Sequence, residues 1–308
     1  MSKLVIWNPS ASRAVGAQGV REDIERDPSV ALHETSSHQE AVELARSADC
    51  DELIVAGGDG TVNSVINGLA QNPRDMPLAI LPLGTGNDLC RSLCVSLDPA
   101  TALLALPHAV NQQMDIVRIA AENASGDHTE MYFANVASGG NSQRVQELVS
   151  SEVKATWGAW SYLRCALPVL QDLRAFEVQL QLDDEPEETM HIWNVIFANG
   201  RTVAGGLPVD PRAQLNDGLL DVIIVLDGTP LDTAALTAEF FLGDYLEDKR
   251  VSFRQARRVR ITSDPPLQIL ADGEALCGDS FELKIVPEAI TVAVDPTCEA
   301  FVTDKSRT

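Results

Sequence analysis

Two glycine-rich turns, each placed directly after a short apolar run, constrain the fold of this chain more than any other feature. The run ELIVA (52–56) leads into GGDGT (57–61), and LAIL (78–81) leads into the turn GTGND (84–88). After the first turn, apolar residues recur at i, i+3, i+4 and i+7 over 62–69, the spacing of a helix with one buried face. A strand, a glycine turn and a helix, repeated along the chain, predict an open, mostly parallel sheet whose strands are connected through helices.

Two earlier strands and one helix extend the same pattern toward the amino terminus. KLVIW (3–7) and SVALHE (29–34) have the length and composition of strands. Ser37 and Glu40 have the spacing of a capping box, which predicts a helix over 39–48. Because the carboxyl ends of parallel strands share one edge of a sheet, we expect the two glycine turns to lie side by side where such sheets bind ligands.

The second half of the chain changes to runs with the character of β-strands. From residue 114 onward, short β-type runs alternate with turn signals, and this pattern predicts an antiparallel β-sandwich. Two segments with helical character, 158–174 and 233–247, interrupt the series. The acidic segment DDEPEE (183–188) is typical of a solvated turn between two strands.

Length and composition limit the number of domains and the class of partner. A chain of 308 residues, 45% of them hydrophobic, can form two cores, and we predict an α/β domain over 1–116 and a β-sandwich domain over 117–297. A formal net charge of −22 repels polyanions, which argues against nucleic acid and also against anionic lipid. The chain shows no signal peptide and no apolar stretch near ~20 residues, so we expect a cytoplasmic protein. Its six cysteines fit neither a disulfide framework nor a zinc site.

The first glycine turn is suited to a phosphate group. Without Cβ atoms at Gly57, Gly58 and Gly60, backbone N–H groups can approach an anion closely, and the following helix adds its positive amino end. The chain contains no GxxxxGK[ST] motif, and the GxGxxG fingerprint does not fit either. Glycine also serves tight turns, which is the alternative for one such turn alone. Asp59 beside phosphates requires a divalent cation between them, which indicates a nucleotide with Mg²⁺ and phosphoryl transfer.

Four motifs resemble those of the diacylglycerol kinase and sphingosine kinase superfamily, in the order NPSA, GGDGTVNSVINGL, PLGTGNDLCRSL and ADGE. Segments of the second half narrow the resemblance to the bacterial YegS-type lipid kinases, over essentially the whole chain: NVASGG, WGAWSYL, FANGRTVAGG, NDGLLDV and ADGEALCGDSFELKIVP. The resemblance implies an ATP-dependent kinase that acts on a lipid hydroxyl. It implies an N-terminal domain of the NAD kinase/diacylglycerol kinase type, a C-terminal β-sandwich, an active site in the cleft between them, and a return of 298–308 to the first domain.

Matched motif by motif, the resemblance implies a set of ATP contacts in the loops at the strand ends. Hydroxyls and bare backbone N–H groups suit phosphate oxygens, and we expect Asn87 to brace the second loop. For Thr35 the alternative is an ordinary residue that leads into a helix. The implied contacts are Thr35, Gly58, Asp59, Gly60, Thr61, Val62, Asn63, Ser64, Gly84, Thr85 and Asn87.

The motif ADGE places Asp272 and Glu274 on either side of a glycine. On an extended backbone both carboxylates would point the same way, into the cleft, where such a pair can hold a metal and take a proton. The alternative is a tight Asp-Gly hairpin with Glu274 in solvent. The resemblance makes Glu274 the acceptor of the lipid hydroxyl proton and Asp272 a metal ligand or second base, with Asp59 helping to place Mg²⁺. Because neighbouring carboxylates titrate together, the sequence does not decide which of these three acids is the catalytic base.

A separate metal site is implied by the segment NDGLL. In the family the matching loop holds Mg²⁺ or Ca²⁺, and here the ligands would be the Gln214 carbonyl, the Asp217 side chain and the Leu219 carbonyl. One carboxylate with carbonyls and waters suits a hard cation, and an ordinary turn is the alternative. Some relatives carry an aspartate just after the motif SGG, where this chain has Asn141 and Ser142, so we expect no metal ligand from that segment.

Two further segments bear on the lipid partner. The run 249–260 carries six basic residues, and it either docks on an anionic membrane or pairs with neighbouring acids. The aromatic segment 157–163 either lines an acyl-chain entrance or belongs to the core. We expect peripheral contact with the inner membrane face and a lipid substrate of the phosphatidylglycerol or diacylglycerol type. A soluble-substrate kinase of the NAD-kinase type and a non-catalytic lipid-binding protein are the alternatives, and the oligomeric state stays open.

Overall fold

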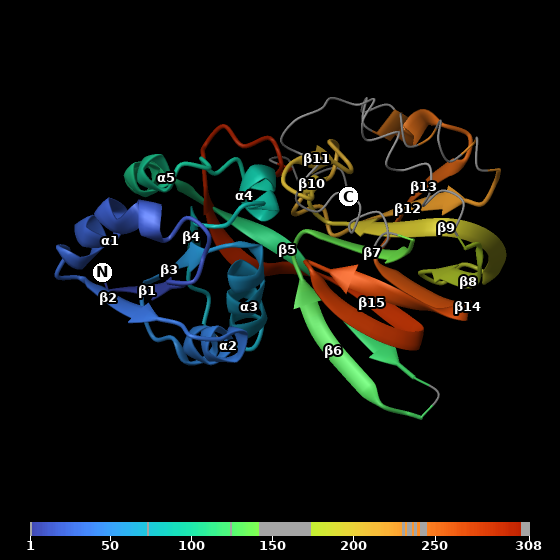
Figure 1. Ribbon diagram of the computed structural model, residues 1–308, viewed down its shortest axis with the longest axis horizontal. Helices are drawn as coiled ribbons and strands as arrows, with labels where there is room; N and C mark the ends of the chain where they lie inside the picture. Colours follow the sequence, from blue (N-terminus) through green and yellow to red (C-terminus); the bar gives the residue numbers. More distant parts are fainter. Residues whose placement is uncertain are drawn as a thin grey trace.

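The computed structural model describes residues 2–72, 74–123, 125–141, 174–229, 232, 236, 239–240 and 245–302. Figure 1 shows two lobes: helices surround a small sheet in one, and long strands make up most of the other. Within the described residues, no helix is long and apolar enough to cross a membrane.

Four parallel strands form the sheet of the first lobe, in the spatial order β4-β3-β1-β2. Each begins within one residue of its expected position, so the predicted parallel sheet is confirmed. The strands are β1 (Lys3–Trp7), β2 (Val30–Glu34), β3 (Glu52–Gly57) and β4 (Leu78–Pro82).

Helices cover both faces of this sheet because alternate residues of a strand point to opposite faces. In β3, Leu53 and Val55 pack in the hydrophobic cluster that includes α2 and α3. Ile54 and Ala56 pack in the cluster on the other face, with α1 and α5. The helices are η1 (Val15–Ala17), α1 (Gln18–Glu25), α2 (His38–Ser47), α3 (Asp59–Leu69), α4 (Asp88–Ser92), α5 (Pro99–Ala105) and η2 (Leu106–His108).

The second lobe is built from antiparallel strands, as predicted. Its core contains buried apolar residues from several strands, among them Phe197, Val222 and Ile261. The elements are β5 (Val110–Glu122), β6 (His128–Phe133), β7 (Val136–Gly140), β8 (Phe176–Leu182), β9 (Glu188–Ala198), β10 (Thr202–Val203), β11 (Leu207–Pro208), β12 (Leu220–Leu226), η3 (Tyr245–Glu247), β13 (Val251–Ala256), β14 (Arg258–Ala271) and β15 (Glu274–Val294).

The strand β15 connects the two lobes. It is 21 residues long and pairs with β14 and β5 in the second lobe. At its far end, Val292 pairs in parallel with Leu78 of β4, so hydrogen bonding runs continuously from one sheet into the other. The lobes are therefore joined by a shared strand (Figure 1), which the sequence pattern did not predict.

Local expectations are confirmed at a helix start and at a charged turn. The hydroxyl of Ser37 accepts the N–H of Glu40 at 3.2 Å and caps α2. The acidic segment 183–188 connects β8 to β9, and Asp183 accepts the N–H groups of Arg257 and Arg258 at 2.9 and 2.8 Å.

Four predicted segments fall wholly or partly outside the described residues. The predicted helix 158–174 and the aromatic segment 157–163 lie outside them, except for residue 174, and so does most of 233–247. Of the segment 298–308, residues 298–302 are described. They form a bent stretch without a strand, and Phe301 packs in the cluster that contains α2 and α3.

Candidate active site

A cavity of about 190 Å³ lies where the glycine turns of the first lobe meet the Asp272 turn of the second lobe. Three aspartates line it, Asp59, Asp88 and Asp272, together with Asn63 and Asn135. The cavity is thus the place where residues from both lobes face a common space.

The two glycine turns touch each other, as predicted. A Cβ atom on Gly84 would come within 2.6 Å of the Cα of Gly58, so this approach requires glycine. The side chain of Asn87 braces the second turn: its Oδ1 accepts the N–H of Gly84 at 3.0 Å, and its Nδ2 donates to the Gly84 carbonyl at 2.8 Å. The turns therefore form one rigid rim.

Asp59 fastens this rim from the first residue of α3. Its carboxylate accepts the N–H groups of Asn87 and Asp88, both at 2.7 Å, and so supplies acceptors at the start of α4. Burial raises the pKa of Asp59, the two N–H bonds lower it, and the negative Asp88 raises it. Asp59 is consequently a structural link between the loops as well as a charge facing the cavity.

Asp88 is a site residue that the sequence reasoning missed. Its carboxylate accepts the N–H groups of Gly205, at 2.9 Å, and of Gly206, at 2.8 Å. Both glycines have positive φ, 83° and 109°, and belong to the turn between β10 and β11 in the second lobe. Asp88 therefore holds the lobes together at the cavity. The position of Asp88 beside Asn87, at the start of a helix, was the available signal.

Asp272 holds the opposite side of the cavity. It is half-buried, and its carboxylate accepts the N–H groups of Ala134 at 2.8 Å, of Val136 at 3.0 Å and of Asn135 at 3.2 Å. Burial raises the pKa of Asp272 to about 6, against the effect of these three N–H bonds, and the charge of Asp59 raises it further. The negative charges of Asp59 and Asp272 therefore repel each other across the cavity.

The predicted common direction of Asp272 and Glu274 is wrong. Asp272 and Gly273 have φ values of 47° and 91°, so the backbone turns instead of running extended. Ala271 pairs with Glu274 across this two-residue hairpin, the tight-turn alternative considered from the sequence. Asp272 points into the protein, whereas Glu274 is exposed at the start of β15.

Two of the predicted hydroxyl contacts are buried and engaged within the protein. Thr35 donates its hydroxyl hydrogen to the carbonyl of Ser37 at 2.8 Å, which is the behaviour of a residue that leads into a helix. The Thr61 hydroxyl accepts Nδ2 of Asn8 at 2.7 Å and connects the first glycine turn to the end of β1. These two side chains shape the loops.

The remaining predicted contacts differ in exposure. Ser64 is buried, donates to the Gly60 carbonyl at 2.9 Å and lies 2.9 Å from Nδ1 of His38. Thr85 is exposed and shares a 3.0 Å hydrogen bond with Ser12. Val62 and Asn63 both line the cavity. The loops thus present backbone groups of the glycine turns to the cavity, and few of their hydroxyl groups are free.

The loop of the predicted second metal site contains Asp217 and lies beside a second carboxylate, that of Asp115. The Asp217 carboxylate accepts the N–H of its neighbour Leu219 at 3.0 Å, and the fully buried Asp115 accepts the N–H of Gly218 at 2.7 Å. Burial raises the pKa of Asp217, and the negative charge of the nearby Asp115 raises it further. The side chain of Gln214 lies back on its own loop, 3.4 Å from the Arg212 carbonyl.

No group of three or more His, Cys, Asp or Glu side chains is arranged to hold a metal ion anywhere in the part of the chain that the structure describes. A cation at either predicted position would therefore need oxygen ligands from backbone carbonyls, from water or from a nucleotide. Mg²⁺ is commonly bound in this way, by one or two carboxylates plus phosphate oxygens.

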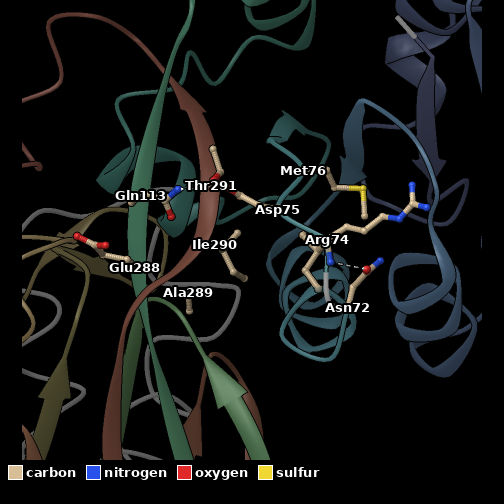
Figure 2. A pocket seen from close by; sticks show the side chains of 10 residues that line it. Asn72, Arg74, Asp75, Met76, Gln113, Glu288, Ala289, Ile290 and Thr291 are labelled. Atoms are coloured by element: carbon tan, nitrogen blue, oxygen red, sulfur yellow. Dashed lines mark hydrogen bonds between the residues drawn. The ribbon is translucent and has the colours of Figure 1, made fainter.

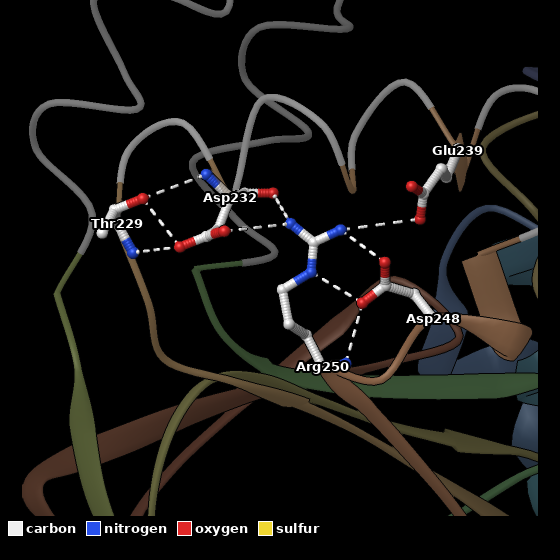
Figure 3. A network of polar contacts seen from close by, with 5 residues as sticks. All are labelled: Thr229, Asp232, Glu239, Asp248 and Arg250. Atoms are coloured by element: carbon white, nitrogen blue, oxygen red, sulfur yellow. Dashed lines mark hydrogen bonds and ion pairs between the residues drawn. The ribbon is translucent and has the colours of Figure 1, made fainter.

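The basic run 249–260 is largely paired with acids. Arg254 forms a two-pronged pair with Glu188 at 2.9 and 3.0 Å. Arg258 contacts Asp184 at 3.3 Å. Figure 3 shows Arg250 surrounded by Asp232, Glu239 and Asp248. These contacts favour the ion-pair interpretation over membrane docking for the paired arginines.

A second cavity, of about 350 Å³, lies elsewhere (Figure 2). It is bordered by Arg74, Asp75 and Met76, which precede β4, and by Gln113 and Thr291 on β5 and β15. The glycine turn follows the carboxyl end of β4, whereas this cavity lies at the amino end of the same strand. It is therefore separate from the candidate active site.

Two family models match the chain. The model described as "Diacylglycerol kinase catalytic domain" matches residues 2–119, and the one described as "YegS C-terminal NAD kinase beta sandwich-like domain" matches residues 134–294. The chain is 28% identical to the "Diacylglycerol kinase" of Bacillus subtilis, over 88% of each chain. It is 30% identical to a Yersinia enterocolitica protein named "Probable lipid kinase YegS-like", over 93% of this chain and 96% of that one.

A solved structure shares the fold. The crystal structure of a diacylglycerol kinase from Bacillus anthracis superposes with a TM-score of 0.71, covering 96% of this chain and 97% of the other at 21% sequence identity. At this identity the likeness supports the two-lobed architecture alone.

Proposed function

The chain belongs to the diacylglycerol kinase family, and we propose that it transfers the γ-phosphoryl group of ATP to a hydroxyl of a membrane lipid of the phosphatidylglycerol or diacylglycerol type. One observation carries this proposal: Asp59 and Asp272, contributed by different lobes, face the same cavity at the glycine rim. Two carboxylates beside a phosphate cradle suit a nucleotide that arrives with a Mg²⁺ ion, because the cation separates the like charges.

The glycine rim would bind the phosphates of ATP. We place them against the turn 58–64 and against Gly84 and Thr85, beside the amino end of the 11-residue helix α3. The close approach of Gly58 and Gly84 keeps side chains out of this position. Asn87 and Asp59 hold the two turns in register, so that the N–H groups are positioned before the nucleotide arrives.

We place Mg²⁺ between Asp59 and Asp272. Burial raises the pKa of both, and each oxygen of Asp59 accepts one N–H from the second glycine turn and retains a lone pair for a cation. When bound, the ion would neutralise charge on the transferring phosphoryl group. At the loop 214–219, we propose a second Mg²⁺ or Ca²⁺ held by Asp217 and the carbonyls of Gln214 and Leu219, with Asp115 nearby.

Glu274 is our choice for the base that accepts the proton of the lipid hydroxyl. It is exposed, next to the turn that lines the cavity, and is therefore accessible to a substrate. Asp272 is half-buried and accepts three backbone N–H groups, which suits a residue that holds the cavity wall and a cation. Asp59 carries two such bonds and suits the same kind of role.

The lipid acceptor implies contact with a membrane surface, and we propose that the protein works peripherally at the cytoplasmic face. The paired arginines of 249–260 do not support docking through that run. The acceptor hydroxyl would have to reach the cavity between the lobes, so the membrane is expected to approach on the side of the Asp272 turn.

The test is transfer of label from γ-labelled ATP to acceptors presented one at a time: phosphatidylglycerol, diacylglycerol and ceramide in vesicles, and NAD in solution. We expect Mg²⁺-dependent labelling of a glycerol-based lipid. Labelling of NAD would instead favour a soluble-substrate kinase. Lipid binding without labelling of any acceptor would favour a non-catalytic protein.

A further inference from the structure

Two cysteines from distant parts of the chain meet beside the junction of the lobes. Cys94 follows the end of α4, and Cys298 lies in the segment after β15. Their Sγ atoms are 2.8 Å apart although 204 residues separate them in sequence. An S–S bond measures about 2.04 Å, so the two sulfurs need to move by less than roughly 1 Å to bond.

The backbone holds both cysteines in place. The N–H of Cys94 donates to the carbonyl of Arg91 at 3.2 Å, within the turn that closes α4. The N–H of Cys298 donates to the Asp295 carbonyl at 3.0 Å, and its Sγ lies 3.8 Å from the carbonyl of Ser92. The thiols are thus brought together by ordered turns on both sides.

The backbone of Cys94 is unusual for its residue type. Its φ is 57°, the left-handed conformation that helices usually assign to glycine or asparagine after their last turn. A cysteine at this position gains no burial, because Cys94 is exposed. Packing therefore does not account for it, whereas its approach to Cys298 does.

Other cysteines of the described chain are placed differently. Cys90 is buried in the core of the first lobe, and burial raises its pKa. Cys50 lies 3.6 Å from the sulfur of Met76. Cys277 is exposed on β15. Cys277 thus offers an exposed thiol for comparison with the pair, and Cys165 lies outside the described residues.

We propose that Cys94 and Cys298 are an oxidation site, a thiol pair that a low-molecular-weight disulfide converts into an intramolecular disulfide. The Cys94 thiolate attacks one sulfur of the small disulfide, the S–S bond of the reagent breaks, and one thiolate leaves. Cys298 then loses its proton to solvent, and its sulfur attacks the Cys94 sulfur and displaces the second thiolate. Two electrons pass from the pair to the reagent, which is reduced to two thiols.

The order of attack follows from exposure. Cys94 is exposed and can meet the reagent, while Cys298 is partly buried. Burial, together with the hydrogen bond from the Cys298 thiol to the Cys94 sulfur, raises the pKa of Cys298 to about 12. Since the thiolate is the attacking form, the first step belongs to Cys94 and the closing step to Cys298.

The bond would add a further connection between the two lobes. The helix α4 begins with Asp88, which holds the turn of Gly205 in the second lobe. The segment that contains Cys298 also contacts that lobe, because the Ala300 carbonyl accepts the N–H of Leu215 at 2.8 Å. A disulfide here would fix the segment 298–302 against α4 and restrict the separation of the lobes.

The test is oxidation of the full-length protein with glutathione disulfide, followed by mass spectrometry of the intact protein and of peptides prepared without reductant. We expect loss of two hydrogens and a cross-linked peptide pair containing Cys94 and Cys298, both reversed by dithiothreitol. Oxidation should raise Tm by roughly 5 °C, because the bond restricts the unfolded chain.

Variants distinguish the pair from single reactive thiols. C298S should accumulate glutathione on Cys94 and show no Tm rise, and C94S should show neither the cross-link nor the rise. C277S serves as the matched control and should behave as wild type. Stable single adducts on wild-type Cys94, a cross-link to another cysteine, or unmodified thiols at Cys94 and Cys298 would each overturn the proposal.

Discussion

Asp272 and Glu274 stand two residues apart on one turn and occupy opposite environments. Asp272 is half-buried and accepts three backbone N–H groups, while Glu274 is exposed at the start of β15. A substitution at Asp272 should therefore damage the fold and the site together, whereas one at Glu274 should affect chemistry alone. The two residues are both acids, so their different surroundings, more than their residue type, give Asp272 a structural role and leave Glu274 available for chemistry.

Replacing Asp272 by Ala should produce the largest effect. The N–H groups of Ala134, Asn135 and Val136 would lose their acceptor, and alanine is disfavoured at a φ of 47°. We expect a loss of about 4 kcal/mol in the free energy of unfolding, with no measurable kinase activity. Urea denaturation checks the first expectation. Glu274→Ala is the control and should keep the wild-type midpoint; equal midpoints for both variants would remove the contrast.

The glycine rim offers a test of the first lobe. In Gly84→Ala, the new Cβ would lie 2.6 Å from the Cα of Gly58, so the two turns must separate. We expect a loss of about 2 kcal/mol in stability and a higher KM for ATP. Gly16→Ala is the matched control, because a Cβ there meets no atom within 4 Å. A Gly84→Ala protein with unchanged stability and KM would show that the close approach of the turns is unimportant.

Two acids whose pKa values are raised should make stability depend on pH in the metal-free protein. Burial raises the pKa of Asp272 to about 6 and of Asp221 to about 7, from 3.8 in both cases. Between the unfolded and folded pKa values the folded state binds more protons, so its stability is greatest at the acidic end and falls as pH rises.

From pH 5 to pH 8 we expect the free energy of unfolding to fall by about 2–4 kcal/mol. Urea titrations across this range measure the change. Asp221→Asn should flatten the curve, since it removes one titrating group, and added Mg²⁺ should restore stability more at pH 8 than at pH 5. Stability that rises over this interval would contradict the expected environment of these acids.

The smallest effect is expected where charges are exposed. Arg254 pairs with Glu188 on the surface, and Arg254→Gln should cost less than about 1 kcal/mol. Binding to vesicles of anionic lipid, measured by sedimentation, should also be unchanged, because this arginine is already paired. Reduced sedimentation of Arg254→Gln with the vesicles would instead support membrane docking through the basic run 249–260.

Much of the first lobe could be predicted because its signals are local. Strand, glycine turn and helix follow one another within about twenty residues, and the Ser37 cap or the Asn87 brace involves near neighbours in sequence. The direction of the Asp272 carboxylate could not be predicted in this way. It depends on the pairing of Ala271 with Glu274, which forces a turn where an extended backbone was assumed.

Long-range contacts account for the rest. Asp88 acquires its role from Gly205 and Gly206, which are 117 and 118 residues away in sequence. The pairing of Val292 with Leu78, which joins the two sheets, leaves no periodic signal either. Such features depend on how the two lobes pack against each other. A single sequence contains no local pattern from which that packing could be predicted.

The decisive measurement is the initial rate of phosphoryl transfer from ATP to the preferred lipid by Glu274→Gln, with Glu282→Gln on the same strand as control. We expect a loss of about 100-fold or more for Glu274→Gln, with an unchanged urea midpoint and an unchanged KM for ATP, and wild-type rates for the control. A Glu274→Gln rate within a few-fold of wild type would show that the exposed acid of the turn is not the base.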